Sequence, residues 1–131
     1  MLNRASVFVA EDEPFIAMDL ALAIEDAGGE VVGPAASVEE ALALLATRTV
    51  VAAILDVNLV DGDCTPLVEV LAGHGIPMIL QTGVGLPPAL AARFPGLVVQ
   101  IKPCVAARLI ERLEVLISGR GCAASTAAGG A

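Results

Sequence analysis

The sequence predicts a doubly wound α/β domain built on a five-stranded parallel sheet. Short apolar segments alternate with helical patterns five times along the 131 residues, and this repeat of strand and helix is typical of parallel sheets. The apolar segments are continuous and do not alternate with polar residues, as expected for strands that helices cover on both faces. The length allows one domain with a substantial core.

The predicted strands share short runs of Val, Ile, Leu and Ala, and aromatic residues make up only 2% of the chain. They are Ser6–Ala10, Glu30–Pro34, Ala52–Leu55, Met78–Gln81 and Leu97–Ile101. Right-handed crossovers and the common strand order 2-1-3-4-5 follow as the default for such a chain. The predicted fold is therefore flavodoxin-like.

A helical pattern follows each strand, and several patterns carry start or stop signals. Ser37-Val-Glu-Glu40 is a capping box that opens the second helix, and Gly28-Gly29 ends the first. In chain order, the predicted helices are marked by Ile16–Ala27, Ser37–Leu45, Thr65–Ala72, the short stretch between Leu86 and Pro95, and Leu109–Ile117. Residues 119–131 have no apolar pattern, so we expect a domain over residues 1–118, then a flexible tail, and no second domain.

Composition and charge exclude several classes of protein. The net charge of −8 argues against binding to a nucleic-acid backbone. The longest apolar runs, such as Val50–Leu55, are far too short to cross a bilayer, and no secretion signal follows Met1. The three cysteines, Cys64, Cys104 and Cys122, lack metal-ligand spacing and favour free thiols in a reducing cytosol. We therefore expect a cytoplasmic protein that binds neither nucleic acid nor membranes.

The residues able to do chemistry lie where the predicted strands end. Glu11 and Asp12 follow the first strand, Asp56 the third, Thr82 the fourth and Lys102 the fifth. In doubly wound sheets, ligands bind beyond the carboxyl ends of the strands, where the strand order reverses. The sequence therefore predicts that three carboxylates, one hydroxyl and one ammonium group meet at one edge of the sheet.

This set of groups favours a magnesium-dependent phosphoryl site. Clustered carboxylates repel one another unless a cation lies among them, and magnesium prefers oxygen ligands. Lys102 would supply a second positive charge to phosphoryl oxygens and Thr82 a hydroxyl donor. In that setting Asp56 can act as a nucleophile and form an acyl phosphate.

The same stretches of sequence resemble the receiver domains of bacterial response regulators. The resemblance rests on Val7–Pro14 (VFVAEDEP), Ile54–Leu59 (ILDVNL), Thr82-Gly83 and Lys102-Pro103, and it covers residues 6–118. The stretch Leu80–Gly85, together with the short fourth helix, is similar to a receiver subgroup common in alphaproteobacteria.

The resemblance implies a role in two-component signalling. It implies that a sensor histidine kinase or a phosphotransfer protein phosphorylates Asp56, and that the domain then signals to a downstream protein. It also implies that Thr82 is the switch hydroxyl and that Lys102 binds the phosphoryl group. The implied magnesium ligands are Glu11, Asp12, Asp56 and the backbone carbonyl of Asn58. A receiver is not an enzyme for a separate substrate, because it catalyses only its own phosphorylation and dephosphorylation.

Three positions depart from the common receiver pattern. Val99 stands where many receivers carry Tyr or Phe as a rotating switch, Val60 replaces a frequent proline, and Cys104 replaces a usual aromatic residue. Val99 is stiff and small, so we expect the Gly83–Pro88 loop to carry the conformational change. The roles of output protein, phosphorelay carrier and phosphate sink all remain open.

Two other interpretations deserve comparison with the receiver. Asp61-Gly-Asp-Cys-Thr65 matches the D-x-D-x-T loop of haloacid-dehalogenase-type phosphatases, but that loop begins directly after a strand, and here the strand leads into Asp56. Those phosphatases also need a later acidic pair for magnesium, and only Glu111 and Glu114 follow Lys102. A degenerate receiver that only binds proteins would lack one of the key residues, and none is missing.

Overall fold

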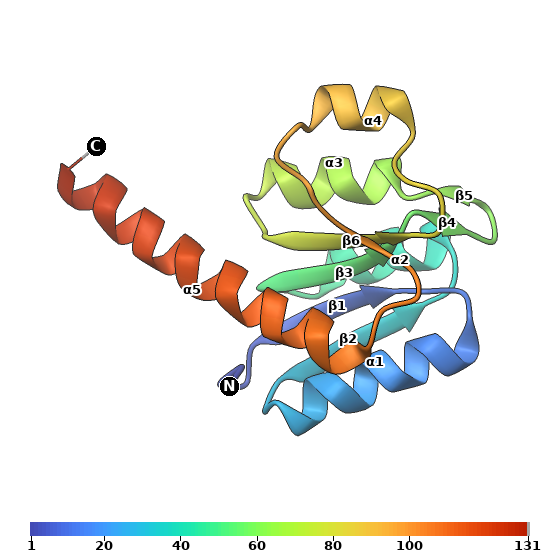
Figure 1. The fold of residues 1–131 in the computed structure, drawn as a ribbon, viewed down its shortest axis with the longest axis horizontal. Helices are drawn as coiled ribbons and strands as arrows, with labels where there is room; N and C mark the ends of the chain where they lie inside the picture. The colour runs from blue at the N-terminus through green and yellow to red at the C-terminus, as the bar shows by residue number, and fades with distance from the viewer. Residues whose placement is uncertain (131) are drawn as a thin grey trace.

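Five parallel strands form the central sheet of the computed structural model, which describes the backbone of residues 1–130 and the side chains of residues 1–119. The strands are β1 (Ser6–Ala10), β2 (Glu30–Ala35), β3 (Ala52–Asp56), β6 (Met78–Thr82) and β7 (Val98–Ile101). Their order is β2-β1-β3-β6-β7 (Figure 1). This is the predicted 2-1-3-4-5 order, and it confirms the doubly wound, flavodoxin-like fold.

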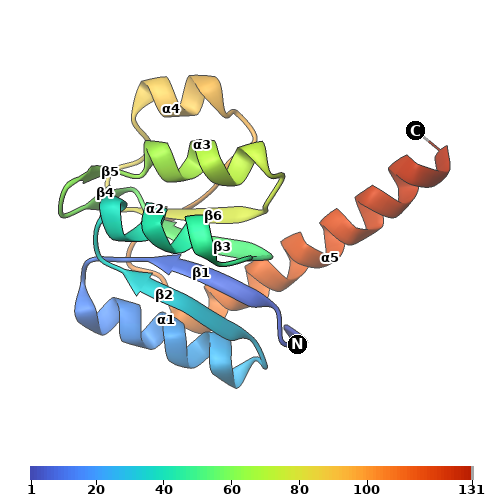
Figure 2. The ribbon, with the colours of Figure 1, turned by 180° about the vertical axis from the view of Figure 1, so that it is seen from behind.

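The helices lie on both faces of the sheet (Figures 1 and 2). They are α1 (Pro14–Asp26), α2 (Val38–Thr47), α3 (Thr65–Gly73), α4 (Pro88–Arg93) and α5 (Ala106–Gly130). Helices α1 and α5 pack against one face, and α2 and α3 pack against the other, where Leu90 of α4 joins the same core. In the described part of the chain, no helix has the length and apolar character needed to cross a membrane.

Strands β1, β2, β3 and β6 each contribute side chains to two separate cores, and Val98 of β7 packs against one of them. In β1, Phe8 belongs to the core beneath α2 and α3, whereas Val7 and Val9 belong to the core beneath α1 and α5. In β3, Leu55 and Ile54 divide in the same way. Burial on both faces explains why the strands are apolar without alternation, as the sequence indicates.

The structure differs from the sequence-based expectation at a few boundaries. β3 and β6 each extend one residue further, to Asp56 and Thr82, because both residues still pair with a neighbouring strand. A short hairpin of β4 (Asn58–Leu59) and β5 (Gly62–Asp63) was not predicted. The sequence predicts a flexible tail over residues 119–131 and a free thiol at Cys122. Except for Gly119, these residues lie outside the part of the chain whose side chains are described. Those two expectations and the domain boundary at residue 118 stay predictions.

The N-terminus of α2 is capped by its own residues, as the capping box predicts. Ser37 Oγ accepts a hydrogen bond of 3.0 Å from the backbone N–H of Glu40. The Glu40 carboxylate accepts the reciprocal hydrogen bond, of 2.9 Å, but from the N–H of Ala36, one residue earlier than in the usual box.

The same helix end is also capped by the β4–β5 hairpin. Asp61 Oδ1 accepts a hydrogen bond of 2.7 Å from the N–H of Val38, and Asp61 Oδ2 accepts one of 3.1 Å from the N–H of Glu39. The Val38 N–H is the main cause of an Asp61 pKa below its usual value. These two hydrogen bonds anchor the loop that follows Asp56 to the N-terminus of α2, where the helix dipole also favours a negative charge.

We predict that both caps stabilise the fold. Ser37→Ala should lower the free energy of unfolding by about 1 kcal/mol, because one helix N–H loses its partner. Asp61→Ala should lower the urea midpoint as well, because two N–H groups are then left to water. Val60→Ala, at an exposed neighbour, is the control and should leave the midpoint unchanged. An Asp61→Ala variant as stable as the wild type would contradict the capping role.

Candidate metal and phosphoryl-acceptor site

The carboxyl ends of the central strands bring the predicted site residues to one edge of the sheet. Ala10 pairs with Leu55, so Glu11 and Asp56 follow as the next residues of two adjacent strands. Asp56 and Gln81 are paired in β3 and β6. Paired residues of parallel strands point to the same face. Glu11, Asp56 and Gln81 therefore form one polar row at the end of the α1–α5 face.

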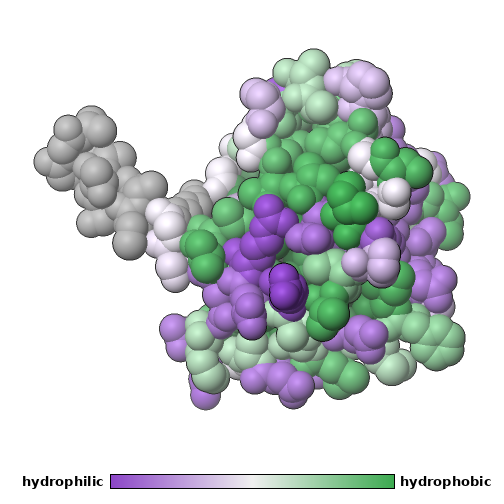
Figure 3. All heavy atoms as spheres, viewed as in Figure 1, coloured by the Kyte–Doolittle hydropathy of each residue, from purple (hydrophilic) through white to green (hydrophobic). Residues whose placement is uncertain are grey.

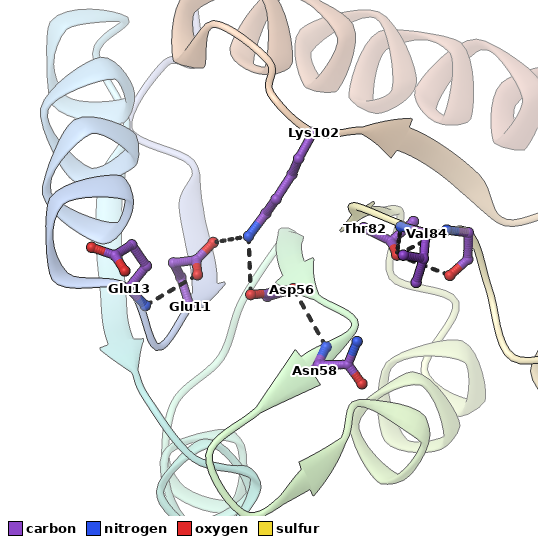
Figure 4. A network of polar contacts seen from close by, with 8 residues as sticks. Glu11, Glu13, Asp56, Asn58, Thr82, Val84 and Lys102 are labelled. Atoms are coloured by element: carbon purple, nitrogen blue, oxygen red, sulfur yellow. Dashed lines mark hydrogen bonds and ion pairs between the residues drawn. The ribbon is translucent and has the colours of Figure 1, made fainter.

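Lys102 crosses this edge and joins the two acids (Figure 4). Its Nζ lies 3.2 Å from Glu11 Oε1 and 3.1 Å from Asp56 Oδ2. The backbone N–H of Lys102 donates to the carbonyl of Thr82 over 2.9 Å, which fixes the start of the side chain at the end of β6. One ammonium group therefore holds two largely buried carboxylates in place.

The pKa values of Glu11 and Lys102 depend on burial and on their charged neighbours. Burial, and then the neighbouring Asp56, raise the pKa of Glu11 from 4.5 to about 7. Burial alone would lower the pKa of Lys102, but its hydrogen bond with Asp56 and the charge of Glu11 outweigh this effect, so the pKa of Lys102 is raised. The site thus carries more negative charge than one ammonium group balances, which is the setting that attracts a further cation.

Asp12 completes a group of three acids. Carboxylate oxygens of Glu11, Asp12 and Asp56 all lie within 4.8 Å of one another. Oxygen donors of this kind, with room for water ligands, match what magnesium prefers. The acidic cluster therefore fits the divalent cation that the sequence predicts.

Asn58 lies beside Asp56 on the first strand of the small hairpin (Figure 4). Its backbone N–H donates a long hydrogen bond, of 3.4 Å, to Asp56 Oδ1. The exposed Asn58 is thus adjacent to the Asp56 carboxylate. Its role as a carbonyl ligand for the metal stays a prediction.

Thr82 lies at the end of β6, but its hydroxyl forms its hydrogen bonds within the loop that follows. It donates to the carbonyl of Gly85 over 2.9 Å, and it accepts from the N–H groups of Val84 and Gly85, each over 3.1 Å. In Figure 4, Thr82 and its partners lie apart from Lys102, Glu11 and Asp56, and no dashed line joins the two groups. In this structure Thr82 is therefore not joined to Asp56.

The rival phosphatase motif is not part of the acidic cluster. Asp61 caps α2, and Asp63 Oδ1 accepts a hydrogen bond of 2.9 Å from the N–H of Thr65 at the start of α3. The residue at the end of the third sheet strand is Asp56. Both aspartates of the motif thus have structural roles in capping helices.

Sequence reasoning missed one residue of the polar row. Gln81 was assigned to a strand without any chemistry, although a polar side chain inside the run Met78–Thr82 was a visible signal. The structure places Gln81 beside Asp56 and buries it. Its amide nitrogen has no hydrogen-bond partner.

Comparisons with known proteins agree on the fold and the family. No protein-family model and no curated protein sequence matches the chain, whereas many solved structures do. A CheY-like response regulator receiver domain protein from Methanospirillum hungatei JF-1 matches with a TM-score of 0.79, 21% identity, and coverage of 89% of this chain and 96% of that chain. This match shows the fold.

Two solved structures are more similar in sequence. SdrG from Sphingomonas melonis Fr1 is 32% identical with a TM-score of 0.72, over 89% of this chain and 98% of SdrG. The response regulator PhyR from Brucella abortus is 31% identical with a TM-score of 0.73, over 95% of this chain but only 51% of PhyR. The sheet order, the site residues at the strand ends and these similarities together show that the chain belongs to the response regulator receiver domain family.

Proposed function

We propose that the chain accepts a phosphoryl group on Asp56 from a sensor histidine kinase or a phosphotransfer protein. The observation that carries this proposal is the position of Asp56, at the end of β3 within an acidic cluster and 3.1 Å from Lys102 Nζ. A nucleophilic carboxylate beside a fixed ammonium group is the arrangement that phosphoryl transfer to aspartate needs.

The transfer itself is a displacement at phosphorus. One oxygen of the Asp56 carboxylate forms a bond to phosphorus while the bond between phosphorus and the histidine nitrogen of the donor breaks. The freed imidazole keeps the electron pair and takes up a proton. Lys102 remains beside Asp56 and stabilises the charge on the phosphoryl oxygens.

Magnesium is the cofactor that this site fits. Glu11, Asp12, Asp56 and the carbonyl of Asn58 are the groups that would hold it, because they supply oxygen ligands at one edge of the sheet. When bound, magnesium supplies positive charge that neutralises phosphoryl oxygens. The chain itself supplies the nucleophile and the fixed ammonium group.

The proposed output begins at Thr82. A hydroxyl that turns toward a phosphoryl group must give up its hydrogen bond to the Gly85 carbonyl and release the N–H groups of Val84 and Gly85. Gly85 has a φ of +97°, which other residues rarely adopt. The loop after β6 is therefore held by one side chain at the end of that strand, and in this proposal it changes shape when the Thr82 hydroxyl turns toward the phosphoryl group.

Exposed apolar residues beside the site suit partner proteins. On α1, Phe15, Met18 and Leu22 are 78%, 60% and 52% exposed and recur at helical spacing, which is typical of a surface that takes a partner helix. We assign this stripe to the phosphoryl donor. On the face drawn in Figure 3, hydrophobic side chains also gather over the segment between α4 and α5, which we assign to the downstream protein.

We predict that acetyl phosphate and magnesium add one phosphoryl group to the wild type. Asp56→Asn should abolish the labelling because it removes the nucleophile, and Asp61→Asn, which leaves Asp56 intact, should label like the wild type. Intact-mass spectrometry and peptide mapping measure both. Labelling that survives in Asp56→Asn and disappears in Asp61→Asn would move the nucleophile to the phosphatase motif.

A second prediction concerns pH without magnesium. The folded protein binds a proton at Glu11 up to about pH 7, whereas the unfolded chain releases it near pH 4.5. The folded state thus loses stability as the pH rises from 4.5 to 7, by on the order of 2–3 kcal/mol. Urea unfolding in the presence of a chelator should show this fall.

Glu11→Gln should remove most of that fall, because the amide cannot ionise. Glu13→Gln is the matched control, since Glu13 is an exposed acid in the same turn, and it should keep the fall of the wild type. An unchanged pH dependence in Glu11→Gln would show that the buried acid is not the cause.

A third prediction concerns the loop after Thr82. Binding of beryllofluoride with magnesium should change the hydrogen-exchange protection of residues 83–94, because the Thr82 hydroxyl leaves Gly85. Thr82→Ser keeps the hydroxyl and should keep the change, whereas Thr82→Val should lose it. If protection changes clearly elsewhere but not in residues 83–94, the output surface lies in another part of the domain.

A further inference from the structure

Helix α5 carries an exposed row of side chains that is apolar at its ends and basic in its middle. Val105, which directly precedes the helix, and Val115 are 68% and 69% exposed. Arg108 and Arg112 lie between them and are exposed as well, and the spacing of three, four and three residues places all four on one side of the helix. Along α5 in Figure 3, hydrophilic side chains accordingly lie between hydrophobic ones. These four residues are called the α5 stripe below.

Neither arginine of the α5 stripe has a carboxylate partner within residues 1–119. The ion pairs of that part of the chain are those of Met1, Arg93 and Lys102. The exposed Glu111 lines the same open hollow of about 610 Å³ as the two arginines but forms an ion pair with neither. Like charges one turn apart destabilise a helix. The domain therefore leaves two adjacent positive charges uncompensated, although its net charge is −8.

Arg112 is held in place and still has donors to offer. Its Nη1 donates hydrogen bonds of 2.6 Å to Gln100 Oε1 and 3.3 Å to the carbonyl of Val99. Its Nε and Nη2 form no hydrogen bond within residues 1–119, and this edge of a guanidinium group can bind both oxygens of a carboxylate. Because the group is already ordered, a carboxylate that binds it loses little affinity to the ordering of the side chain.

The α5 stripe begins beside the loop that Thr82 holds. Ile101, the last residue of β7, is 53% exposed and is paired with Thr82 across the sheet. The stripe is thus continuous with the apolar segment between α4 and α5 that we assign to the downstream protein. Its four residues add the chemical character of that surface.

We propose that the α5 stripe docks an amphipathic helix of the downstream protein, which carries two acidic residues between two apolar ones on one side. The acidic residues accept hydrogen bonds from Arg108 and Arg112, and the apolar residues cover Val105 and Val115. This occupant complements the stripe in charge and in the position of its apolar groups. A nucleic acid would not cover the apolar ends, and the net charge of −8 repels it. That the helix belongs to the downstream protein rests on the proposed function, whereas its binding to the stripe does not.

The binding test uses two peptides that differ only in charge. The probe is a fluorescently labelled, alanine-based peptide of about 18 residues, with Leu, Glu, Glu and Leu at the spacing of the α5 stripe. The control peptide has Gln in place of both Glu residues, which changes helix propensity little. With the full chain at low ionic strength, anisotropy should give a Kd of about 100 μM or tighter for the Glu peptide and binding about fivefold weaker for the Gln peptide. Because the chain as a whole repels an acidic peptide, tighter binding of the Glu peptide reports on the local arginines.

Variants place the binding on the α5 stripe. Arg108→Gln removes one guanidinium group and should weaken binding of the Glu peptide about fivefold. Arg48→Gln is the matched control, because Arg48 is an exposed arginine at the end of α2, on the other face of the sheet. It makes the same change in net charge and should bind like the wild type. Equal binding of the two peptides, or an equal loss of affinity in the two variants, would overturn the proposal.

Sedimentation distinguishes a second copy of the chain as the occupant. The exposed side of α1 also combines apolar and acidic residues, among them Leu22 and Asp26, so it is the alternative within the chain. The proposal expects the wild type and Arg108→Gln to be in the same oligomeric state. A wild-type dimer that Arg108→Gln dissociates would overturn the proposed occupant in favour of self-association.

The coupling to phosphorylation has its own readout. Beryllofluoride with magnesium should change the affinity of the wild type for the Glu peptide by about threefold or more, because Ile101 is paired with Thr82, at the start of the loop that changes shape. An unchanged affinity, with beryllofluoride bound as seen by fluorine NMR, would overturn the assignment to the downstream protein and leave the acidic docking site standing. A chain that binds the Glu peptide but neither beryllofluoride nor phosphate would overturn the proposed function instead.

Discussion

The contact of one lysine with two buried acids is the interaction on which the site depends. Lys102 Nζ bridges Glu11, which follows β1, and Asp56, which ends β3. Lys102 itself follows β7, the strand at one edge of the sheet. Without that ammonium group, two carboxylates beneath the surface would face each other unpaired. The doubly wound sheet provides this meeting point, because the chain reverses its direction of winding between β1 and β3.

The rest of the domain holds the surroundings of this contact in place. Asp61 ties the loop after Asp56 to α2, so the segment that includes Asn58 is anchored at both ends. On the other side of the site, Thr82 holds the loop that follows β6 through three hydrogen bonds of one hydroxyl. The first loop is fixed to a helix end, whereas the second is fixed to a single side chain. In the function that we propose, a change at Asp56 is transmitted through the second loop.

The sheet order and the location of Glu11, Asp12, Asp56 and Lys102 were predictable from the sequence, because buried parallel strands are continuous apolar runs and their ends share one edge. The β4–β5 hairpin was not, since its strands of two residues carry no periodicity. The capping role of Asp61 depends on a contact with Val38, 23 residues away in sequence, which local patterns cannot indicate. The unpaired amide of Gln81 was also beyond sequence reasoning, because satisfaction of a buried group depends on what the fold packs around it.

We propose above all that Asp56 accepts the phosphoryl group and that Lys102 stabilises the charge on its oxygens. A crystal structure of the chain with magnesium and beryllofluoride tests it most directly. The account predicts beryllium bonded to an Asp56 oxygen, magnesium among Glu11, Asp12 and Asp56, and Lys102 Nζ moved from Glu11 to a fluoride. Beryllofluoride on another carboxylate, or a Lys102 that still bridges Glu11 and Asp56 with the fluorides elsewhere, would contradict it.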